Sequence, residues 1–149
     1  MDHKESPQDQ INVIIALFSS GKTQEAIDAI EALIKDYPNE PLLYNIGGVF
    51  YKQIGQLDEA IKKFEKALAI NPDYAEAHNN LGVTLQNLGL MDKAVTSYEK
   101  SIASNPDYAE AHNNLGNIFK ELEQLDAAVK SYEKVIAINP DYPEAHYNL

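Results

Sequence analysis

The sequence predicts an all-α protein, a right-handed superhelical solenoid of stacked antiparallel helix pairs, and repetition is the main reason. The string NPDYAEAHNNLG occupies residues 71–82 and again residues 105–116, an offset of 34. A related string, NPDYPEAHYNL, occupies residues 139–149, and Pro38 lies 34 residues before Pro72. Between these marks, apolar residues recur at helical spacing. One helix pair cannot bury both of its apolar faces, so successive pairs must stack.

The period divides the chain into four complete units and the beginning of a fifth. We expect repeats at 7–40, 41–74, 75–108 and 109–142, followed by a partial fifth repeat at 143–149. Residues 1–6 precede the first repeat, and we expect them to form a disordered N-terminus. The repeats together form one array that covers residues 7–149.

Each unit contains the pattern of two helices separated by a tight turn. In the third unit Leu81 and Leu85 share one face of a first helix, and Gly89 interrupts this helical pattern. Ala94 and Tyr98 then share one face of a second helix. Glycine adopts positive φ without steric cost, and a proline in the Asn-Pro-Asp-Tyr segment disfavours helix in the residue before it. The predicted helices are 8–20 and 23–36, 41–53 and 57–70, 75–87 and 91–104, and 109–121 and 125–138.

When the units are aligned by their 34-residue period, each position in the unit forms a column. The residues that recur in these columns resemble the signature of the tetratricopeptide repeat (TPR) family. The columns of the three most regular units hold Tyr44, Gly47, Gly48, Tyr51, Ala60, Phe64 and Pro72, then His78, Leu81, Gly82, Leu85, Ala94, Tyr98 and Pro106, then His112, Leu115, Gly116, Phe119, Ala128, Tyr132 and Pro140. The resemblance implies a helical solenoid whose first helices line a concave wall where partners dock. Small residues at the glycine and alanine columns are predicted to be the points where paired helices touch.

Two columns depart from the family pattern. The first unit has Ile14 where the others have glycine, so we expect its helix pair to be splayed or to act as a cap. The fourth unit has Glu123 where the others have Gly21, Gly55 and Gly89 at the turn. If positive φ is still required there, the substitution costs about 1 kcal/mol.

Composition and charge exclude several classes of function. The basic residues are 12 lysines and there are 23 acidic residues, so the formal charge is -11, and a nucleic-acid partner is not expected. Without cysteine there are no disulfides or thiolate metal sites. The longest apolar run, residues 11–18, is too short to span a membrane. Because acidic residues outnumber Lys4 before this run, it does not resemble a signal peptide, and we expect an intracellular, cytoplasmic protein.

The evenly spaced His78, His112 and His146 do not predict a metal site. Residues 34 apart lie one repeat apart, on the order of 10 Å for packed helices, whereas zinc ligands all lie about 2 Å from the metal. We therefore expect these rings to pack between helices. No catalytic triad, carboxylate pair or phosphate loop has the required spacing, so we expect no metal, no cofactor and no enzymatic activity.

Asparagine accumulates where the resemblance places the inner wall, although asparagine forms helices poorly. An amide can donate to a peptide carbonyl and accept from a peptide N–H, so these residues could bind an extended backbone. The column that holds Asn12, Asn80, Asn114 and Asn148 is similar to the asparagine ladder in the TPR region of O-linked N-acetylglucosamine transferases. Repeat duplication that merely copied common family residues is the alternative. The candidate peptide-binding residues are Asn45, Asn79, Asn80, Asn113, Asn114, Asn117 and Asn148.

Two further features concern the specificity of this wall. Family members that bind acidic chaperone tails use basic residues at positions that here hold asparagine or Glu110 and Glu144, so an acidic tail should be repelled. Toward the N-terminus the inner columns become apolar, and such a patch is usually covered by a partner. The residues of this apolar patch are Ile11, Ile15, Phe18, Leu42, Ile46 and Val49.

The sequence therefore favours a protein-interaction module or scaffold that binds an extended polypeptide segment. One alternative is the N-terminal targeting or substrate-selecting region of a longer transferase, and another is a self-assembling structural scaffold. The partial fifth repeat lacks its second helix, so we expect Ala145, Leu149, Val135 and Ile138 to be exposed at the C-terminal end. Such an uncapped end predicts a homo-oligomer.

Overall fold

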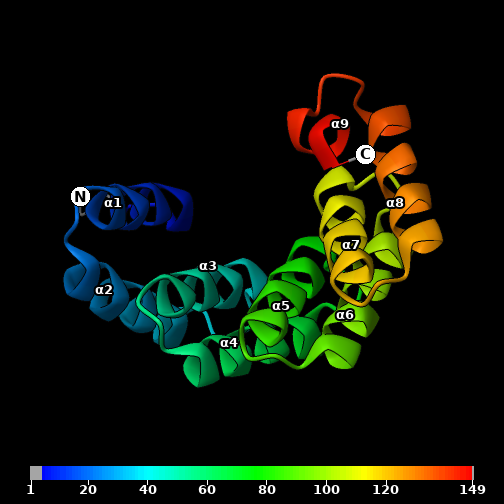
Figure 1. Ribbon diagram of the computed structural model, residues 1–149. Coiled ribbons are helices and arrows are strands. Elements are labelled where there is room, and N and C mark those ends of the chain that lie inside the picture. Colours follow the sequence, from blue (N-terminus) through cyan, green and yellow to red (C-terminus); the bar gives the residue numbers. More distant parts are fainter. Residues whose placement is uncertain (1–4, 149) are drawn as a thin grey trace. The chain divides into compact units, whose positions relative to one another are not determined.

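The computed structural model describes residues 5–148, and within them the chain forms helices and turns without β-strands. The predicted helices are confirmed, each to within one residue at either end. Figure 1 shows their course along the chain. The helices are α1 (Pro7–Ser19), α2 (Thr23–Asp36), α3 (Pro41–Gln53), α4 (Leu57–Ile70), α5 (Ala75–Asn87), α6 (Met91–Ser104), α7 (Ala109–Glu121), α8 (Leu125–Ile138) and α9 (Pro143–Asn148).

The first helix begins one residue earlier than expected because Ser6 caps it. The Ser6 hydroxyl accepts from the backbone N–H of Asp9 at 3.2 Å, and the Asp9 carboxylate accepts from the backbone N–H of Ser6 at 3.3 Å. This reciprocal arrangement is a capping box, which satisfies two donors that the helix leaves unpaired. Residues 5 and 6 are therefore ordered, whereas residues 1–4 of the expected disordered N-terminus lie outside the described residues.

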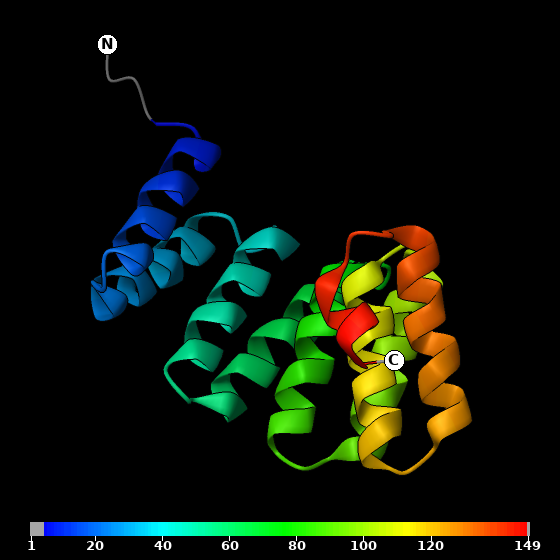
Figure 2. The same cartoon turned by 45° about the horizontal axis from the view of Figure 1, so that its top comes forward.

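The chain divides into two compact units at Pro72 and Asp73. In the first unit α1 pairs with α2, α3 pairs with α4, and α2 packs on α3. In the second unit α5 pairs with α6, α7 pairs with α8, α6 packs on α7, and α8 packs on α9. Figure 2 shows the antiparallel course of each pair from another side. Each unit is thus a stack of helix pairs, as the 34-residue period predicts.

Close contact between paired helices depends on a glycine that faces an aromatic ring. A Cβ placed on Gly82 would lie 2.6 Å from Cε1 of Tyr98, and one on Gly116 would lie 2.7 Å from Cε1 of Tyr132. The prediction that helices touch at these glycines is confirmed. In the first pair Ile14 takes the place of glycine and Ile30 that of the ring, and both are buried.

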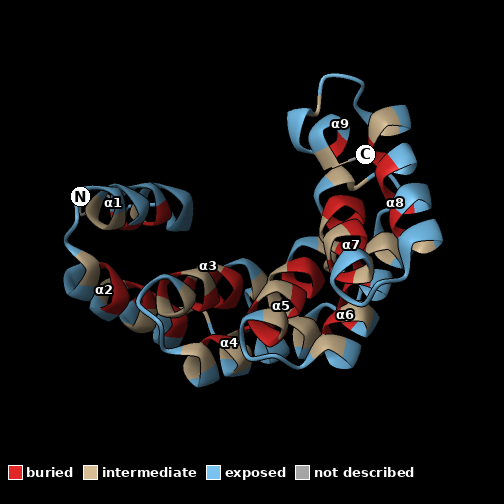
Figure 3. Ribbon diagram, in the orientation of Figure 1, coloured by how far each residue is buried: buried red, intermediate tan, exposed pale blue. Residues whose placement is uncertain are grey.

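The turns between paired helices use positive φ. Gly21, Gly55 and Gly89 have φ between +77° and +81°, and Glu123 has φ of +59°. The fourth turn therefore keeps the left-handed conformation although it lacks glycine. Figure 3 shows buried residues on the facing sides of paired helices. No described helix combines the length and the apolar character that a membrane span requires.

Candidate functional site

Four partly exposed asparagines form a polar surface on α5, α7 and α9. We call them the asparagine surface, which consists of Asn80, Asn114, Asn117 and Asn148. Asn114 donates from Nδ2 to Oδ1 of Asn79 at 3.0 Å, which links α7 to α5. Asn148 donates from Nδ2 to Oδ1 of Asn117 at 3.2 Å, which links α9 to α7. The amides therefore bond to one another from helix to helix.

Three of the predicted peptide-binding asparagines do not lie on this surface. Asn45, Asn79 and Asn113 are 2%, 0% and 6% exposed. Their prediction as groove residues is wrong in this respect, because their column faces the neighbouring helix rather than solvent. The hydrogen bond between Asn114 and Asn79 shows this for the second unit, since the Asn79 amide is covered by a residue of α7.

These internal bonds decide which amide atoms remain for a ligand. The Asn117 carbonyl oxygen accepts from both Asn148 and the Tyr132 hydroxyl, so it is used within the fold. By contrast, the Oδ1 atoms of Asn114 and Asn148 accept no hydrogen bond from the described part of the chain. Their Nδ2 donors hold both side chains in place. The surface therefore presents acceptors of fixed direction.

A stripe of carboxylates and phenols lies on the same helices as the asparagine surface. The sequence pointed to two of its glutamates, Glu110 and Glu144, but to none of its tyrosines. We call it the Glu–Tyr stripe, which consists of Glu76, Tyr108, Glu110, Tyr142 and Glu144. The Tyr108 hydroxyl donates to Oε2 of Glu110 at 3.4 Å. Burial, followed by the charges of Glu110 and Glu76, raises the pKa of Tyr108, while the Asn79 amide lowers it. Each phenol thus lies near carboxylates of two successive repeats.

The same relation recurs one repeat further on. Burial raises the pKa of Tyr142, and the charges of Glu144 and Glu110 raise it further. The signal in the sequence is the recurring Asp-Tyr-x-Glu, which puts a phenol and a carboxylate at the start of α5, α7 and α9. Within a single unit, the helix dipole alone explains the glutamate, because a negative charge is favourable at the start of a helix. Only the packing of successive first helices brings each phenol near the carboxylate 32 residues earlier in the chain.

The histidines bond to the preceding turn. Nε2 of His112 lies 2.8 Å from the carbonyl oxygen of Pro106, and Nε2 of His146 lies 2.6 Å from that of Pro140. Tyr44, at the same column, donates its hydroxyl to the Pro38 carbonyl at 2.8 Å. This column therefore ties each first helix to the turn six residues earlier. Within residues 5–148 no three His, Asp or Glu side chains come together as metal ligands.

The predicted apolar patch belongs to the first unit and is only partly a surface. Ile15 and Leu42 are exposed, and Ile46 and Val49 are half-buried. Phe18 is also half-buried and stacks on Phe50, with ring centroids 4.2 Å apart. Ile11 is only 6% exposed, so its prediction as a groove residue is wrong: its side chain packs inside the unit.

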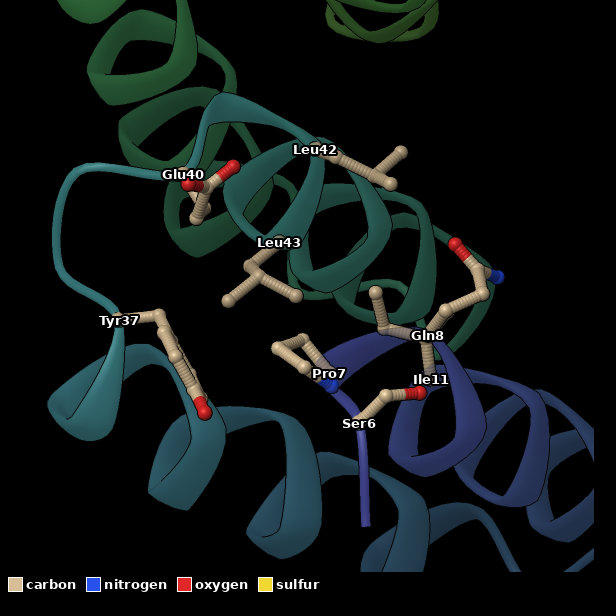
Figure 4. Close-up of a pocket in the computed structure, with 8 residues that line it drawn as sticks. All are labelled: Ser6, Pro7, Gln8, Ile11, Tyr37, Glu40, Leu42 and Leu43. Carbon is tan, nitrogen blue, oxygen red and sulfur yellow. The ribbon is translucent and has the colours of Figure 1, made fainter.

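A cavity of about 390 Å³ lies beside this patch. Figure 4 shows side chains from α1, from α3 and from the turn that precedes α3 around it. Its lining is mainly apolar at Pro7, Tyr37 and Leu43, with polar groups from the caps of α1 and α3. The lining residues are Ser6, Pro7, Gln8, Ile11, Tyr37, Glu40, Leu42 and Leu43.

The C-terminal end exposes less apolar surface than predicted. Ala145 and Val135 are both 0% exposed, because α9 packs on α8, so their predicted exposure is wrong. Ile138 is half-buried, and Leu149 lies outside the described residues. The large side chain exposed here is Tyr147, at 90%.

Comparisons with known proteins agree with this architecture. The profile described as "TPR repeat" matches residues 48–89, 91–122 and 116–149, and that described as "Tetratricopeptide repeat" matches residues 15–40. No curated protein is a significant sequence match to the chain.

Three solved structures are similar. A crystal structure of MamA is 28% identical over 89% of this chain and 78% of its own, with a TM-score of 0.81. The first TPR of Spaghetti (RPAP3), bound to the HSP90 peptide SRMEEVD, is 26% identical over 74% of this chain and 87% of its own, with a TM-score of 0.71. PilF of Pseudomonas aeruginosa shares the fold at 18% identity, over 95% of this chain and 65% of its own, with a TM-score of 0.87.

Proposed function

Because the chain belongs to the tetratricopeptide repeat family, we propose that it is a protein-interaction module whose asparagine surface binds an extended polypeptide segment. Family members act mainly by binding other proteins, and one similar structure contains a bound peptide. The observation that carries the proposal is the helix-to-helix bonding of Asn114 to Asn79 and of Asn148 to Asn117. These bonds fix the amides before a ligand arrives.

Fixed amides are suited to recognition of a peptide backbone. The carbonyl oxygens of Asn114 and Asn148 are one repeat apart and can each accept a backbone N–H. Their side chains are already ordered, so binding does not require further loss of their rotamer freedom. Backbone contacts of this kind hold the segment without selecting its side chains. The proposed role is therefore binding alone, without chemical change of the partner.

The charges near this surface disfavour one class of partner. The peptide bound to the similar RPAP3 structure, SRMEEVD, is acidic at its C-terminal end. In this chain Glu110 and Glu144 lie at exposed positions beside the asparagine surface. Like charges across an interface oppose binding, so we propose that the partner is not an acidic chaperone tail.

Selection from a random peptide library displayed on phage, against the whole immobilised chain, tests the proposed function. We expect enrichment of extended segments that bind wild type and bind Asn114→Ala at least about fivefold more weakly. The matched control is Thr96→Ala on α6, which removes a polar side chain from the other helix layer and should leave affinity unchanged. Binding is measured at a temperature where circular dichroism shows equal helicity for all three proteins.

Two results would overturn the proposal. The first is a selection that enriches no peptide for wild type over an unrelated control protein. The second is enriched peptides whose affinity is the same for wild type and for the fully helical Asn114→Ala variant, because the fixed amides would then be irrelevant to binding.

A further inference from the structure

The two helix layers of the second unit differ in net charge. Figure 1 shows α5, α7 and α9 on one side and α6 and α8 on the other. The described residues of α5, α7 and α9 include four glutamates and a single lysine, Lys120. The helices α6 and α8 also carry four acidic residues, but these are matched by four lysines, Lys93, Lys100, Lys130 and Lys134. The layer that carries the asparagine surface is therefore the more negatively charged one, because most of its carboxylates are not balanced by lysines.

Among the described residues, the carboxylates of the Glu–Tyr stripe have no cationic partner. Glu76, Glu110 and Glu144 are all exposed, and none forms an ion pair within the described chain. They do not gather into one metal-binding group either. Instead each belongs to a different repeat, with the half-buried rings of Tyr108 and Tyr142 between them. The stripe is thus a series of separate negative sites with aromatic faces between them.

A second observation concerns a buried amide beneath this surface. Asn113 is 6% exposed, and its Oδ1 is buried without a hydrogen-bond partner in the described chain. Its counterpart one repeat earlier, Asn79, uses Oδ1 to accept from Asn114 and lies close enough to Tyr108 to lower its pKa. The repeat therefore places Asn113 at the corresponding position near Tyr142. A buried carbonyl oxygen without a donor is unfavourable, so a ligand N–H that gained access to it would be stabilising.

We propose that the Glu–Tyr stripe makes the second unit selective for an extended polypeptide with lysine or arginine at about every third residue. This inference rests on the proposed function, because it concerns the chemistry of the segment that the asparagine surface binds. Ammonium and guanidinium groups match the carboxylates, and their stems can lie on the tyrosine rings. Every group that carries the proposal, including the orphaned Asn113 oxygen, is an acceptor or an aromatic face.

The spacing of the cations follows from stacking geometry. Packed helices lie about 8–10 Å apart, and an extended chain in the polyproline II conformation advances about 3.1 Å per residue with three residues per turn, so that every third side chain lies on the same face. A step from one carboxylate to the next therefore corresponds to about three residues of ligand. Lysines grouped at one end of a peptide could reach at most two of the three glutamates at once.

The first test is the composition of the peptides that the phage selection enriches. An excess of lysine and arginine at three-residue intervals supports the inference. An enriched set with no excess of basic residues overturns it and leaves the proposed function standing. If no peptide is enriched, the proposed function fails, and this inference fails with it.

The second test uses two variants that differ only in the layer they alter. Glu76→Gln with Glu110→Gln removes two charges at the second residue of α5 and α7. Asp92→Asn with Asp126→Asn removes two charges at the second residue of α6 and α8. Both variants lose the same net charge at the same helix position, whereas only the first alters a carboxylate that accepts from a stripe tyrosine, Tyr108.

The probes are a twelve-residue peptide with lysine at every third position, separated by glycine and serine, and a peptide of the same composition with its lysines grouped together. By isothermal titration calorimetry at low salt, we expect the spaced peptide to bind wild type at least about fivefold more tightly than the grouped one. The glutamine variant should lose about tenfold in affinity for the spaced peptide, and the asparagine variant less than twofold. Equal affinity for the two peptides, or equal losses in the two variants, would show attraction by net charge alone and overturn the inference.

Discussion

Gly48 of α3 lies directly against the ring of Phe64 on α4. A Cβ at Gly48 would come 2.5 Å from Cε1 of that ring, closer than any real side chain approaches. The neighbouring residue, Gly47, has quite different surroundings, because a Cβ there would meet only ordinary contacts at 3.8 Å or more with Lys63 and Ile30. Steric exclusion therefore requires glycine at position 48 but not at position 47 of the same helix.

This difference predicts opposite effects for the same substitution at adjacent positions. Gly48→Ala should lower the free energy of unfolding by about 1–3 kcal/mol, because the ring is held inside the helix pair and cannot yield. Gly47→Ala should be neutral or raise it by up to about 1 kcal/mol, because alanine favours helix. Urea denaturation of both variants measures this. Equal effects would mean that the ring of Phe64 can move aside.

The turn at Glu123 offers a stabilising substitution. Its φ of +59° is unfavourable for a residue with a side chain, whereas glycine occupies this region freely. Glu123→Gly should therefore raise the free energy of unfolding by up to about 1 kcal/mol, and Gly89→Ala in the equivalent turn should lower it by a similar amount. Thermal melts of the two variants should shift in opposite directions, and a lower melting temperature for Glu123→Gly would contradict the strain argument.

Removal of the Asn114 amide should affect folding as well as binding. Nδ2 of Asn114 satisfies the buried Oδ1 of Asn79. Asn114→Ala should cost about 1–3 kcal/mol, because a buried acceptor is left unpaired. The exposed Asn87→Ala is the control and should cost less than about 0.5 kcal/mol. In a double-mutant cycle with Asn79→Ala the two losses should not add.

Alkaline pH should destabilise the protein through its buried phenols. Burial and the nearby Glu31 raise the pKa of Tyr51 to about 12, and burial raises the pKa of Tyr98 and Tyr108 as well. An unfolded tyrosine titrates near pH 10, so above that pH the unfolded chain releases protons that the native chain retains. The free energy of unfolding should be level below about pH 10 and fall above it. A shallower fall for Tyr108→Phe checks the assignment, and a rise would contradict it.

Self-association of the C-terminal end stays a prediction, with Tyr147 now its main apolar group. Its side chain is 90% exposed, whereas Ala145 and Val135 are covered. If this end joins two copies of the chain, Tyr147→Ser should weaken association in sedimentation experiments, and Val13→Ser, an exposed apolar change in the first unit, should not. A monomer at high micromolar concentration for wild type would show that the end is too small to drive assembly.

The sequence by itself determined the helices, the turns and the pairing of helices, because these depend on local periodicity and on short-range contacts that repeat every 34 residues. The glycine–aromatic contacts at Gly82 and Gly116 could be read from the columns for the same reason. The expected packing of the histidines holds for the buried His78 and His112 and is wrong for His146, which is exposed. The repeat pattern was insufficient to predict contacts between side chains of different repeats. Asn79 and Asn80 are adjacent and identical in type, yet one is buried and the other half-exposed.

Only the tertiary structure decided which atoms remain for a ligand. Whether an amide is satisfied depends on a residue about one repeat away, as with Asn114 and Asn79 or Asn148 and Asn117. The closeness of Tyr108 to Glu76 and of Tyr142 to Glu110 likewise follows from stacking, since these pairs lie 32 residues apart in the chain. Hydrogen bonds and charges act over a few ångströms, so their partners are known only once the helices are placed side by side.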